Sequence, residues 1–504
     1  MQSSTFPDPT PCLIHGEWQL GQSDSQAQVY NPSTGQVIAQ APLCTAEQTS
    51  RAVESAAGAL PSWSATPVVE RARLMFRFLA LMEQHFEELS QLVTLEHGKT
   101  LAESRAEVQR GVEMVEFASG VPSLITGETL ANIAPHVDAE TVRHPAGVCV
   151  GITPYNFPNM VPLWMFPVAL VCGNTFVLKP SEKVPLSVVR LGELLLEAGL
   201  PEGVLNIVHG NRTCVDTLIR HPQVDAISFV GSTPVAKHIY ETGTSHEKRV
   251  QAAGGAKNHL IIMPDADLDQ SVKALAASAY GCAGQRCMAG SVAVAIGDAG
   301  DPLVDALCQH AASMRVGPSD GREDVDMGPL ITADHVDRVA GYLDVAVEDG
   351  AQVALDGRRQ FEGDGFLLGP SVIDQVQQQM RIAREEIFGP VLSVIRVPDL
   401  AAALEVGRHC EFGNGASIFT SSGYAAREFK QHFNAGMIGI NVGVPAPMAW
   451  FPFTGWNRSF FGDLHIQGKE SIMFYTRQKM TLTRWFESAA DSHQDPVWKS
   501  SRSG

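Results

Sequence analysis

The sequence predicts an α/β protein whose central element is a doubly wound parallel sheet, and three observations lead to this fold class. From residue 148 onward, short apolar runs of strand length alternate with stretches of helix length, which is the pattern of parallel strands joined by crossover helices. The chain has 504 residues, of which 44% are hydrophobic and 18% charged, so it can bury large cores. A chain of this length is expected to form two or more domains.

The region from Val68 to Ser119 is predicted to be helical. Glu70–Glu96 shows helical periodicity in one or two pieces, Gly98 follows as a helix-ending residue, and another helix is expected over Leu101–Ala118. The tripeptide at 98–100 imitates the end of a phosphate-binding P-loop, but Val93 stands where that motif needs glycine, and a helix precedes it. We therefore interpret the tripeptide as a helix end.

Two series of alternating strands and helices follow. The first predicts strands over Val148–Ile152, Asn174–Leu178, Val204–Val208 and Ala226–Val230, with helices near Pro162–Val171, over Val184–Ala198 and over Val235–Tyr240. The second, from His259 to about Val444, predicts strands over Leu260–Met263, Val292–Ile296, Gln352–Leu355 and Val391–Arg396. No G-x-G-x-x-G motif follows any strand of the first series, so a dinucleotide bound there would not have its pyrophosphate held in the usual Rossmann manner.

Two stretches of alternating polar and apolar residues belong to neither series. They cover Leu130–Arg143 and Phe474–Trp485. Isolated strands of this kind often pair across subunits, so we expect an oligomerisation arm and a homotetramer or homodimer.

Charge and cysteine content bear on partners and compartment. The 37 basic and 55 acidic residues give a net charge of −18, which argues against a nucleic-acid partner. Nine cysteines, an odd number, do not suggest a disulfide framework, so a reducing compartment is expected. No Lys or Arg precedes Arg51, and the longest apolar run, Met160–Gly173, is shorter than the roughly 20 residues that span a bilayer. We expect a cytoplasmic protein without a membrane partner.

A cysteine in a small-residue turn is the strongest candidate for chemistry. Cys287 lies in Gly284-Gln285-Arg286-Cys287-Met288, where backbone N–H groups can face an oxyanion that develops on a substrate. Arg286 should favour the thiolate electrostatically. The alternative is a small buried hydrophobe, which is the role we assign to Cys282. A metal site on these two cysteines is not expected, because no matching Cys or His pair stands nearby.

Five motifs in order and spacing make the chain resemble the aldehyde dehydrogenase superfamily over nearly its whole length. They are Thr153-Pro154-Tyr155-Asn156-Phe157-Pro158, Leu178-Lys179-Pro180-Ser181-Glu182, Phe229-Val230-Gly231-Ser232-Thr233, Gly284-Gln285-Arg286-Cys287 and Glu385-Glu386-Ile387-Phe388-Gly389-Pro390-Val391. Within that superfamily, Gly255-Ala256-Lys257-Asn258-His259, Arg286-Cys287-Met288-Ala289 and Phe453-Thr454-Gly455-Trp456 resemble the CoA-acylating methylmalonate-semialdehyde dehydrogenases. The resemblance implies an NAD- and CoA-dependent oxidation of methylmalonate or malonate semialdehyde, with loss of carbon dioxide.

The resemblance also implies a division of the chain. We expect a doubly wound NAD-binding domain, an αβ catalytic domain, a β oligomerisation arm and two flexible tails. Their expected ranges are 12–123 and 146–252 for the NAD-binding domain, 253–446 for the catalytic domain, 124–145 and 472–486 for the arm, and 1–11 and 487–504 for the tails.

Cys287 is the implied nucleophile. The side-chain amide of Asn156 is the implied oxyanion donor, with the backbone N–H of Cys287 as the second donor. Local sequence alone favours a turn-capping role for Asn156.

Arg110 and Arg286 match positions that would hold a substrate carboxylate. The guanidinium fork suits a carboxylate because it offers two parallel hydrogen bonds. From local sequence alone, an i,i+3 pair of Arg110 with Glu107 is the better interpretation, and Arg105 is then an equal candidate for the carboxylate.

NAD is the implied cofactor and CoA the implied co-substrate. In the family, Lys179 and Glu182 hold the adenosine ribose, and a carboxylate there suits paired hydroxyls and repels a 2′-phosphate. Ser232 caps a helix whose N-terminus suits a pyrophosphate, and Glu386 matches the residue that holds the nicotinamide ribose. Local sequence alone would equally allow a solvated pair of Lys179 and Glu182. The cofactor-binding residues that we expect are Thr153, Tyr155, Lys179, Glu182, Lys183, Ser232, Gly254 and Glu386.

The residue at position 253 bears on the fate of the acyl group. Hydrolytic members of the family have there a glutamate that activates water, whereas this chain has Ala253, in a stretch from Gln251 to His259 without a carboxylate. A thioester on Cys287 would then persist until CoA takes the acyl group. If another carboxylate supplies the base, the protein is instead a hydrolytic NAD-dependent dehydrogenase of an acidic semialdehyde such as succinate semialdehyde. A third possibility is a non-catalytic protein that keeps the fold.

Overall fold

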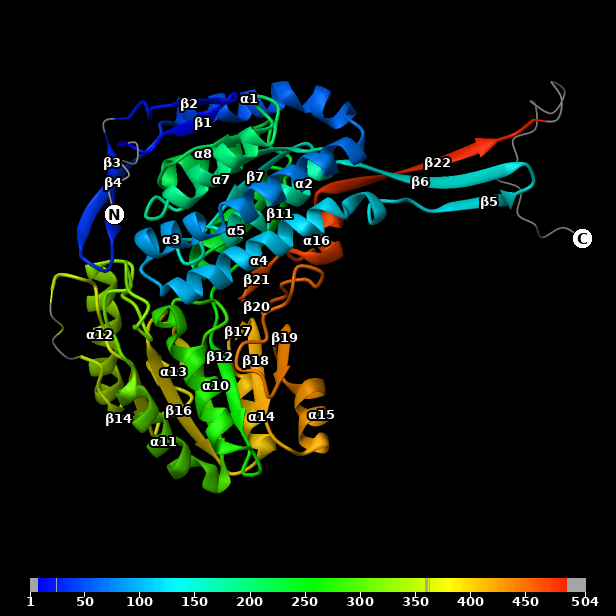
Figure 1. The fold of residues 1–504 in the computed structure, drawn as a ribbon. Helices are drawn as coiled ribbons and strands as arrows, with labels where there is room; N and C mark the ends of the chain where they lie inside the picture. Colours follow the sequence, from blue (N-terminus) through cyan, green and yellow to red (C-terminus); the bar gives the residue numbers. More distant parts are fainter. Residues whose placement is uncertain (1–7, 24, 359–360, 362, 487–504) are drawn as a thin grey trace, which may run out of the picture.

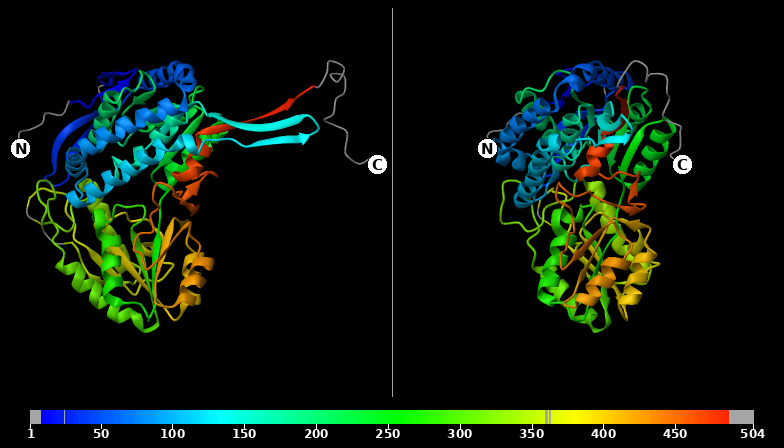
Figure 2. Two further views of the ribbon diagram at one scale, coloured as in Figure 1. Left: turned by 45° about the vertical axis from the view of Figure 1, so that its right-hand side comes forward. Right: turned by 90° about the vertical axis from the view of Figure 1, so that its right-hand side faces the viewer.

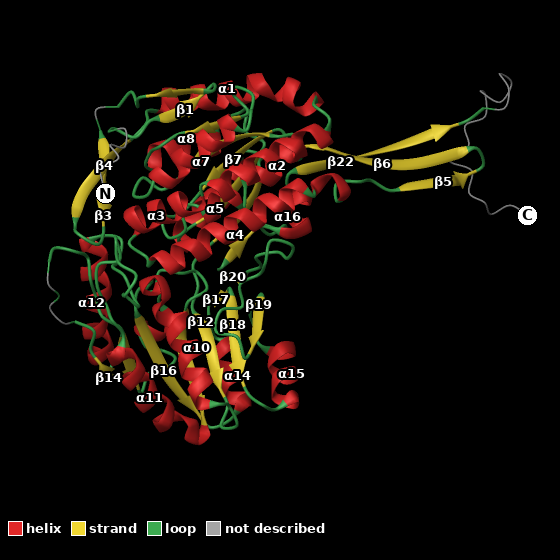
Figure 3. Cartoon of the chain, viewed as in Figure 1, coloured by secondary structure: helices red, strands yellow, loops and turns green. Residues whose placement is uncertain are grey.

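Two large, mostly parallel sheets and one small projecting sheet make up the fold (Figures 1 and 3). The computed structural model describes residues 8–23, 25–358, 361 and 363–486. In Figure 1 the first large sheet and its helices form the upper half of the molecule, and the second sheet forms the lower half. The predicted α/β fold class is confirmed.

The first sheet has eight strands in the order β2-β1-β9-β8-β7-β10-β11-β21. The strands from β9 to β11 run parallel. From β7 the chain builds outward through β8 and β9 and then on the other side through β10 and β11, so a topological switch point lies at β7. The strands are β1 (Cys12–Ile14), β2 (Glu17–Gln19), β7 (Val148–Ile152), β8 (Thr175–Lys179), β9 (Leu205–Ile207), β10 (Ala226–Val230), β11 (Arg249–Ala253) and β21 (Phe460–Phe461).

Helices cover both faces of this sheet, because successive residues of β7 belong to different cores: Cys149 to one cluster and Val150 to another. Gly98 ends α3 in the left-handed conformation at φ +88°, and Thr100 begins α4 with a capping box that Glu103 completes. The helices are α1 (Ala46–Ala65), α2 (Val68–Gln84), α3 (Phe86–His97), α4 (Leu101–Ser119), α5 (Met160–Leu163), α6 (Phe166–Val171), α7 (Leu186–Glu197), α8 (Arg212–Arg220) and α9 (Thr233–Ser245).

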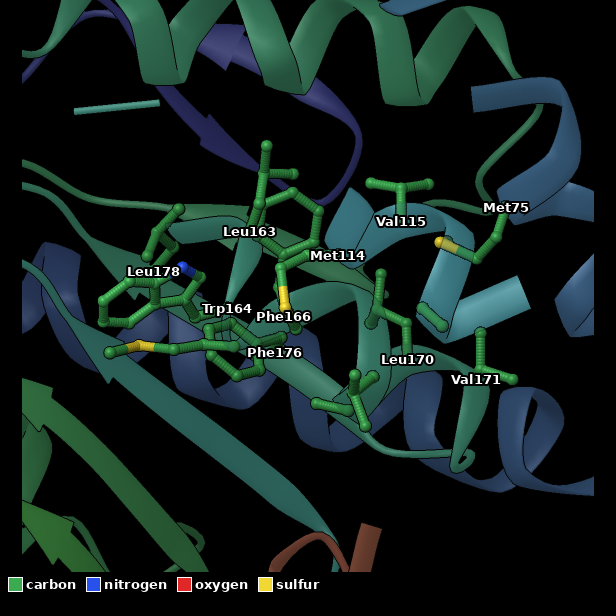
Figure 4. Close-up of a cluster of buried hydrophobic side chains, with 14 of the residues drawn as sticks. Met75, Met114, Val115, Leu163, Trp164, Phe166, Leu170, Val171, Phe176 and Leu178 are labelled. Carbon is green, nitrogen blue, oxygen red and sulfur yellow. The ribbon is translucent and has the colours of Figure 1, made fainter. Parts of the chain in front are cut away.

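The most apolar run of the chain lies in the larger core of this half. Figure 4 shows Trp164 and Phe166 of that run packed with Met75 of α2, Met114 of α4 and Phe176 of β8. The run is apolar because it is covered on all sides by protein. Among the described residues, no helix combines the length and apolar character that a membrane crossing requires.

The second sheet has seven strands in the order β14-β15-β16-β13-β12-β18-β19, all parallel to their neighbours except the β14–β15 pair. Its strands are β12 (Asn258–Ile262), β13 (Gly290–Ile296), β14 (Gln352–Leu355), β15 (Ser371–Asp374), β16 (Val391–Val397), β18 (Gly415–Phe419) and β19 (Met437–Ile440). Its helices are α10 (Leu268–Tyr280), α11 (Gly300–Ser313), α12 (Ala333–Glu348), α13 (Arg381–Arg384), α14 (Leu400–Arg408) and α15 (Gly423–His432).

An antiparallel sheet of three strands projects from the upper half as an arm (Figures 1 and 2). The two stretches of alternating pattern pair with each other within the chain, from Thr476 opposite Pro145 to Arg484 opposite Val137. The role of this arm in oligomerisation stays a prediction. Its strands are β5 (Thr129–Ala134), β6 (Val137–Pro145) and β22 (Thr476–Arg484), and the remaining small elements are β3 (Gln26–Asn31), β4 (Gln36–Pro42), β17 (Phe412–Gly413), β20 (Trp456–Asn457) and α16 (Gly468–Phe474).

The structure differs from the sequence expectations in several places. Strand β11 was not expected, because its residues include Gln251 and two alanines, and it exists because it pairs with β10 along its whole length. Strand β21 joins the first sheet although it lies outside the ranges predicted for that domain. The helix predicted over Val235–Tyr240 is longer, Thr233–Ser245. Thr10, expected in a flexible tail, is buried and donates to the carbonyl of Gln40, whereas 1–7 and 487–504 lie outside the described residues.

Candidate active site

Cys287 lies in a turn between α10 and β13 that the surrounding backbone holds tightly. Cys282 and Ala283 have φ of 50° and 52°, and Gly284 follows at 72°; left-handed non-glycine residues store strain and gather at functional sites. A Cβ on Gly284 would lie 2.2 Å from the carbonyl oxygen of Gly389. The position therefore requires glycine, as a tight turn under a nucleophile does.

The backbone of Cys287 is fixed by two amides from the second sheet. The Nδ2 atoms of Asn258 and Asn414 each donate to the Cys287 carbonyl oxygen at 2.9 Å. Because β12 and the residue before β18 supply these donors, the position of Cys287, the candidate nucleophile, is set by two neighbouring strands of the sheet. Such support holds a reactive side chain in one geometry.

Burial, the largest effect, and the negative charge of Glu386 raise the pKa of the Cys287 thiol, and the backbone N–H groups of Cys287 and Met288 lower it; the net result is a pKa of about 12. Arg286 also lowers it, in the direction expected from the sequence, but this is the smallest of the five effects. Arg286 thus lowers the pKa of Cys287 as expected, but burial and the charge of Glu386 raise this pKa by more.

A cavity of about 390 Å³, which we call the Cys287 cavity, opens over this turn. Both predicted carboxylate-binding residues, Arg110 and Arg286, line it together with Cys287, although Arg110 is on α4, far away in the sequence. Apolar walls come from Phe157, Trp164 and Phe453 among others. The fold therefore brings a thiol and two guanidinium groups to one partly apolar chamber, as a ligand site requires.

Each arginine of the Cys287 cavity already has a carboxylate partner. Arg286 lies 3.2 Å from Glu103, and its Nε also donates to the Cys282 sulfur at 3.3 Å. Arg110 pairs with Glu113 at 2.7 Å, so the alternative partner expected from the sequence, Glu107, is wrong.

The other candidate for the substrate carboxylate, Arg105, binds Glu87 and Glu323 and does not line the Cys287 cavity. It is therefore not equal to Arg110. Cys282, expected in the core, is buried, yet it also lines the Cys287 cavity.

Asn156 is held beside the nucleophile's turn by a buried ion pair that the sequence did not reveal. Its Nδ2 donates to the carbonyl of Gln285 at 3.0 Å, which leaves one amide hydrogen available. The backbone carbonyl oxygen of Asn156 accepts a hydrogen bond from Lys99 Nζ at 2.6 Å. Lys99 also forms an ion pair with Glu107 at 2.6 Å, and neither of these two charged side chains is exposed. Glu107 in turn accepts the backbone N–H of Asn159 at 2.8 Å.

Lys99 thus holds the backbone of the Asn156 loop in place, whereas the sequence indicated only that Lys99 follows the end of a helix. It also lies under the Phe157 ring, 4.0 Å from the centroid. The signal in the sequence was a lysine at a helix start followed by glutamate eight residues later, which local patterns cannot distinguish from surface charge.

The residues predicted to hold the adenosine ribose lie at the carboxyl end of β8. Lys179 Nζ is 2.9 Å from Glu182. Burial raises the pKa of Glu182. The positive charge of Lys179 and the hydrogen bond that Lys179 donates are the main opposing effects, and the net pKa of Glu182 lies below its ordinary value. Next to it, Thr153 has a buried hydroxyl with no hydrogen-bond partner among the described residues, and Lys183 lies over the Tyr155 ring at 5.2 Å.

Ser232 and Glu386 face a second cavity, of about 460 Å³, between the two halves. Ser232 immediately precedes α9, but its side chain makes no capping hydrogen bond within the described chain, contrary to the expected cap. Glu386 accepts the N–H of Ala256 at 2.9 Å, and burial raises the pKa of this carboxyl. Gly254 packs against the backbone of Arg458, and a Cβ at position 254 would lie 2.8 Å from the Arg458 carbonyl oxygen. The close approach of this backbone is therefore enough to account for a glycine at this position.

No carboxylate stands at the end of β11, where Ala253 is buried. The acidic residues that line the Cys287 cavity are all engaged: Glu103 with Arg286, Glu107 with Lys99 and Glu113 with Arg110. Each of these carboxylates therefore has a cationic partner. Within the described parts of the chain, no group of three or more His, Cys, Asp or Glu side chains could hold a metal ion.

Comparison with known proteins adds to this geometry. The sequence pattern described as the aldehyde dehydrogenase family matches residues 18–481. Malonate-semialdehyde dehydrogenase of Halalkalibacterium halodurans is 50% identical over 474 residues, which cover 94% of this chain and 98% of that protein. Malonate-semialdehyde dehydrogenase 1 of Geobacillus thermodenitrificans matches with the same identity and coverage.

Solved structures agree in fold. Methylmalonate-semialdehyde dehydrogenase from Oceanimonas doudoroffii superposes with a TM-score of 0.94 at 46% identity, over 96% of this chain and all of that one (100%). A structure from Sinorhizobium meliloti, described as a methylmalonate-semialdehyde dehydrogenase complexed with NAD, gives a TM-score of 0.94 at 43% identity, over 97% and 100% of the two chains.

Proposed function

The chain belongs to the aldehyde dehydrogenase family, and from that premise we propose that it oxidises malonate or methylmalonate semialdehyde, with NAD as hydride acceptor and CoA as acyl acceptor. As a member of this family it is an enzyme, an aldehyde dehydrogenase. The observation that carries the finer proposal is the Cys287 cavity, where a thiol and two arginines meet. The names of the relatives, malonate- and methylmalonate-semialdehyde dehydrogenase, agree with it.

A semialdehyde with a carboxylate fits this cavity at both ends. Its aldehyde carbon would face the Cys287 sulfur, and its carboxylate would bind Arg286 and Arg110. Both arginines are partly exposed to the cavity, 22% and 43% for their side chains, so a substrate carboxylate can join or replace Glu103 and Glu113 as partner. A guanidinium group has enough donors for two carboxylates.

The dinucleotide-facing residues present groups that fit NAD. The hydroxyl of Thr153 is buried and unpartnered among the described residues, and the Ser232 hydroxyl is not used as a helix cap. Glu182 keeps its charge beside the switch point of the first sheet, where it would accept hydrogen bonds from ribose hydroxyls and disfavour a 2′-phosphate. When bound, NAD supplies the hydride acceptor.

The residues around Cys287 would carry out the remaining chemistry. The Cys287 thiol loses its proton to solvent as its sulfur attacks the aldehyde carbon, and the free amide hydrogen of Asn156 and the Cys287 N–H donate to the resulting oxyanion. After loss of hydride, a thioester remains on Cys287. Its carbonyl is β to the substrate carboxylate and accepts the electron pair as carbon dioxide leaves, while the same two donors stabilise the enolate. The enolate carbon then takes a proton from solvent, which gives the acetyl or propionyl thioester on Cys287.

Transfer to CoA rather than hydrolysis follows from the engaged carboxylates. Ala253 cannot activate water, and the acidic residues of the Cys287 cavity are each paired with a cation. With no carboxylate at position 253 and with those of the Cys287 cavity paired to cations, the thioester waits for a better nucleophile than water, and a thiol is one.

The test is NADH formation from malonate and methylmalonate semialdehyde with and without CoA, with the acyl product identified. We expect acetyl-CoA and propionyl-CoA, respectively, and at most a single burst of NADH when CoA is omitted. The Cys287→Ala variant is the control and should form no burst. Steady formation of free acid without CoA, at the rate seen with CoA, would show that the protein is a hydrolytic dehydrogenase.

A further inference from the structure

The turn that carries Cys287 is bound by a carboxylate from the opposite half of the molecule. Glu103 lies in the first turn of α4, in the upper half of Figure 1, whereas the turn follows α10 in the lower half. The Oε1 atom of Glu103 accepts the backbone N–H of Cys282 at 2.6 Å. The two residues are 179 positions apart in the sequence, so only the fold brings them together.

Glu103 binds the turn where its backbone is strained. Cys282 has φ 50° and ψ 34°, and Ala283 has φ 52° and ψ 37°. Two successive left-handed residues with side chains are disfavoured in a free chain, and they persist only where the surrounding structure holds them. A short hydrogen bond from the Cys282 N–H to a charged acceptor is a strong contact of the kind that this conformation requires.

The position of Cys282 is passed on to the residues that would carry the chemistry. Its carbonyl oxygen accepts the backbone N–H of Gln285 at 3.0 Å and the Gln285 Nε2 at 3.2 Å. Gln285 lies two residues before Cys287, and its own carbonyl oxygen accepts the amide of Asn156 at 3.0 Å. A shift at Cys282 would therefore move both the thiol and the oxyanion donor.

Glu103 is itself fixed from its own helix. Its Oε2 atom accepts the backbone N–H of Thr100 at 3.0 Å and the Thr100 hydroxyl at 3.1 Å. This capping box leaves the Oε1 atom for Cys282, and the Glu103 side chain is only 16% exposed. A side chain that is already ordered can hold a second group in one geometry, as the support of a reactive site requires.

The same carboxylate oxygen also binds Arg286. The Nη2 atom of Arg286 donates to the Glu103 Oε1 at 3.2 Å, and its Nε donates to the Cys282 sulfur at 3.3 Å. A Cβ at position 281 would lie 2.5 Å from the Arg286 Nη2, so Gly281 leaves room for the guanidinium group to fold back onto the turn. Glu103, Cys282 and Arg286 thus form one hydrogen-bonded unit in the wall of the Cys287 cavity.

We propose that Glu103 is a positioning residue of the reaction, which acts through Cys282 and Gln285 to keep the Cys287 thiol and N–H directed at the substrate. This inference rests on the proposed function, in which Cys287 is the nucleophile. Glu103 exchanges no proton with the substrate in this role. The role depends on the length of the glutamate side chain, because its carboxylate has to bridge α4 and the turn.

The experiment measures the burst of NADH that the full-length enzyme forms without CoA, at saturating NAD, with malonate semialdehyde or with propanal. Propanal has no carboxylate for Arg286 to bind, so its burst reports on the nucleophile. Glu103→Asp keeps the charge on α4, but its side chain is one methylene too short to reach Cys282. The rate constant of the burst should fall about 10-fold or more with both aldehydes, because misplacing a reacting group by about 1 Å can cost on the order of 100-fold. The KM for NAD should not change.

Two matched variants separate this role from a general effect on the fold. Glu103→Gln keeps the reach and one oxygen for the Cys282 N–H, so its burst rate with propanal should lie within about threefold of that of the unmodified enzyme. Thr100→Ala removes the hydroxyl of the capping box and leaves the contact between Glu103 and Cys282. It should lower the unfolding temperature and leave the burst rate unchanged.

Three results would overturn the inference. The first is an unchanged burst rate in Glu103→Asp with both aldehydes. The second is an effect confined to the KM for malonate semialdehyde, which would mean that Glu103 acts only through Arg286. The third is a loss of burst rate in Thr100→Ala as large as that in Glu103→Asp, which would assign the effect to the cap of α4.

The propanal burst distinguishes a failure of this inference from a failure of the proposed function. If the unmodified enzyme forms NADH from propanal but from neither semialdehyde, the proposed substrate is wrong, and the propanal burst still decides the role of Glu103. If it forms NADH from none of the three aldehydes, the proposed function fails and this inference falls with it.

Discussion

Replacing Lys99 by methionine should loosen the loop that carries Asn156. The ammonium group of Lys99 contacts Glu107 and the Asn156 carbonyl oxygen at 2.6 Å each, and neither charged side chain is exposed to solvent. Methionine has nearly the same volume and reach, so the change removes the charge and two hydrogen bonds without opening a large cavity. Glu107 is left as a buried carboxylate without its cation.

The size of the effect follows from that geometry. Removing one partner of a buried ion pair costs about 3–5 kcal/mol, because the remaining charge is uncompensated. Glu107 keeps the N–H groups of Asn159 and Met160 at 2.8 and 3.1 Å, so we expect the lower end of that range. If Asn156 shifts, one oxyanion donor is lost, which typically lowers kcat by about 10²–10³-fold.

The assay combines hydrogen exchange and kinetics. Amide exchange in peptides that cover 154–163 should accelerate in Lys99→Met, while β12 and β13 keep their protection. The kcat should fall and the KM for NAD should not change, because Lys99 does not line the cavity that Ser232 and Glu386 face. A merely structural role would change stability without this split between kcat and KM.

Two further variants test the reasoning. Lys99→Met/Glu107→Gln removes both charges and keeps an oxygen for the two backbone N–H groups, so it should exchange more slowly than Lys99→Met alone. Lys273→Met breaks an exposed pair with Asp269 and should leave stability nearly unchanged. If Lys99→Met is as mild as Lys273→Met, the ion pair does not position the loop.

Three other predictions follow from single groups. Because burial and Glu386 raise the pKa of Cys287 to about 12, alkylation by iodoacetamide without NAD should accelerate about tenfold per pH unit up to pH 10, and a plateau near the ordinary thiol pKa would contradict this. Ala253→Glu should increase hydrolysis relative to CoA transfer, and an unchanged product ratio would show that position 253 does not select the acceptor. Burial lowers the pKa of His209 to about 4; its unfolded form binds protons more readily, so stability is complete above about pH 6.5 and declines toward pH 4. The free energy of unfolding should fall by about 2 kcal/mol less in His209→Gln than in the unmodified protein between pH 7 and pH 5, which urea unfolding at the two pH values measures.

Local patterns were sufficient for several strands that are rich in apolar residues. Val148–Ile152, Ala226–Val230 and Gln352–Leu355 were predicted with the bounds that the structure has. A buried parallel strand needs apolar residues on both faces, so it is visible in sequence alone. The turn around Cys287 was visible for a similar reason, because Gly284 answers a local backbone requirement.

Elements with weaker patterns were not predictable in this way. Strand β11 ends at Ala253 and contains few strand-forming residues. Strand β21 has only two residues, and they pair with β11 although the two strands are more than two hundred residues apart in the sequence. Both owe their form to a neighbouring strand rather than to their own residues. Helix α1, which contains Pro61, was not expected either.

The sequence by itself determined the alternation of strands and helices in the two sheets, the candidate nucleophile and the absence of a carboxylate at position 253, because each depends on neighbours along the chain. Only the tertiary structure decided what each charged group touches. Glu107 pairs with Lys99 rather than Arg110, Arg286 pairs with Glu103, and Glu103 also binds the backbone of Cys282. Hydrogen bonds and ion pairs act over a few ångströms in space, so the partner of a charged side chain is known only after the fold has brought distant segments together.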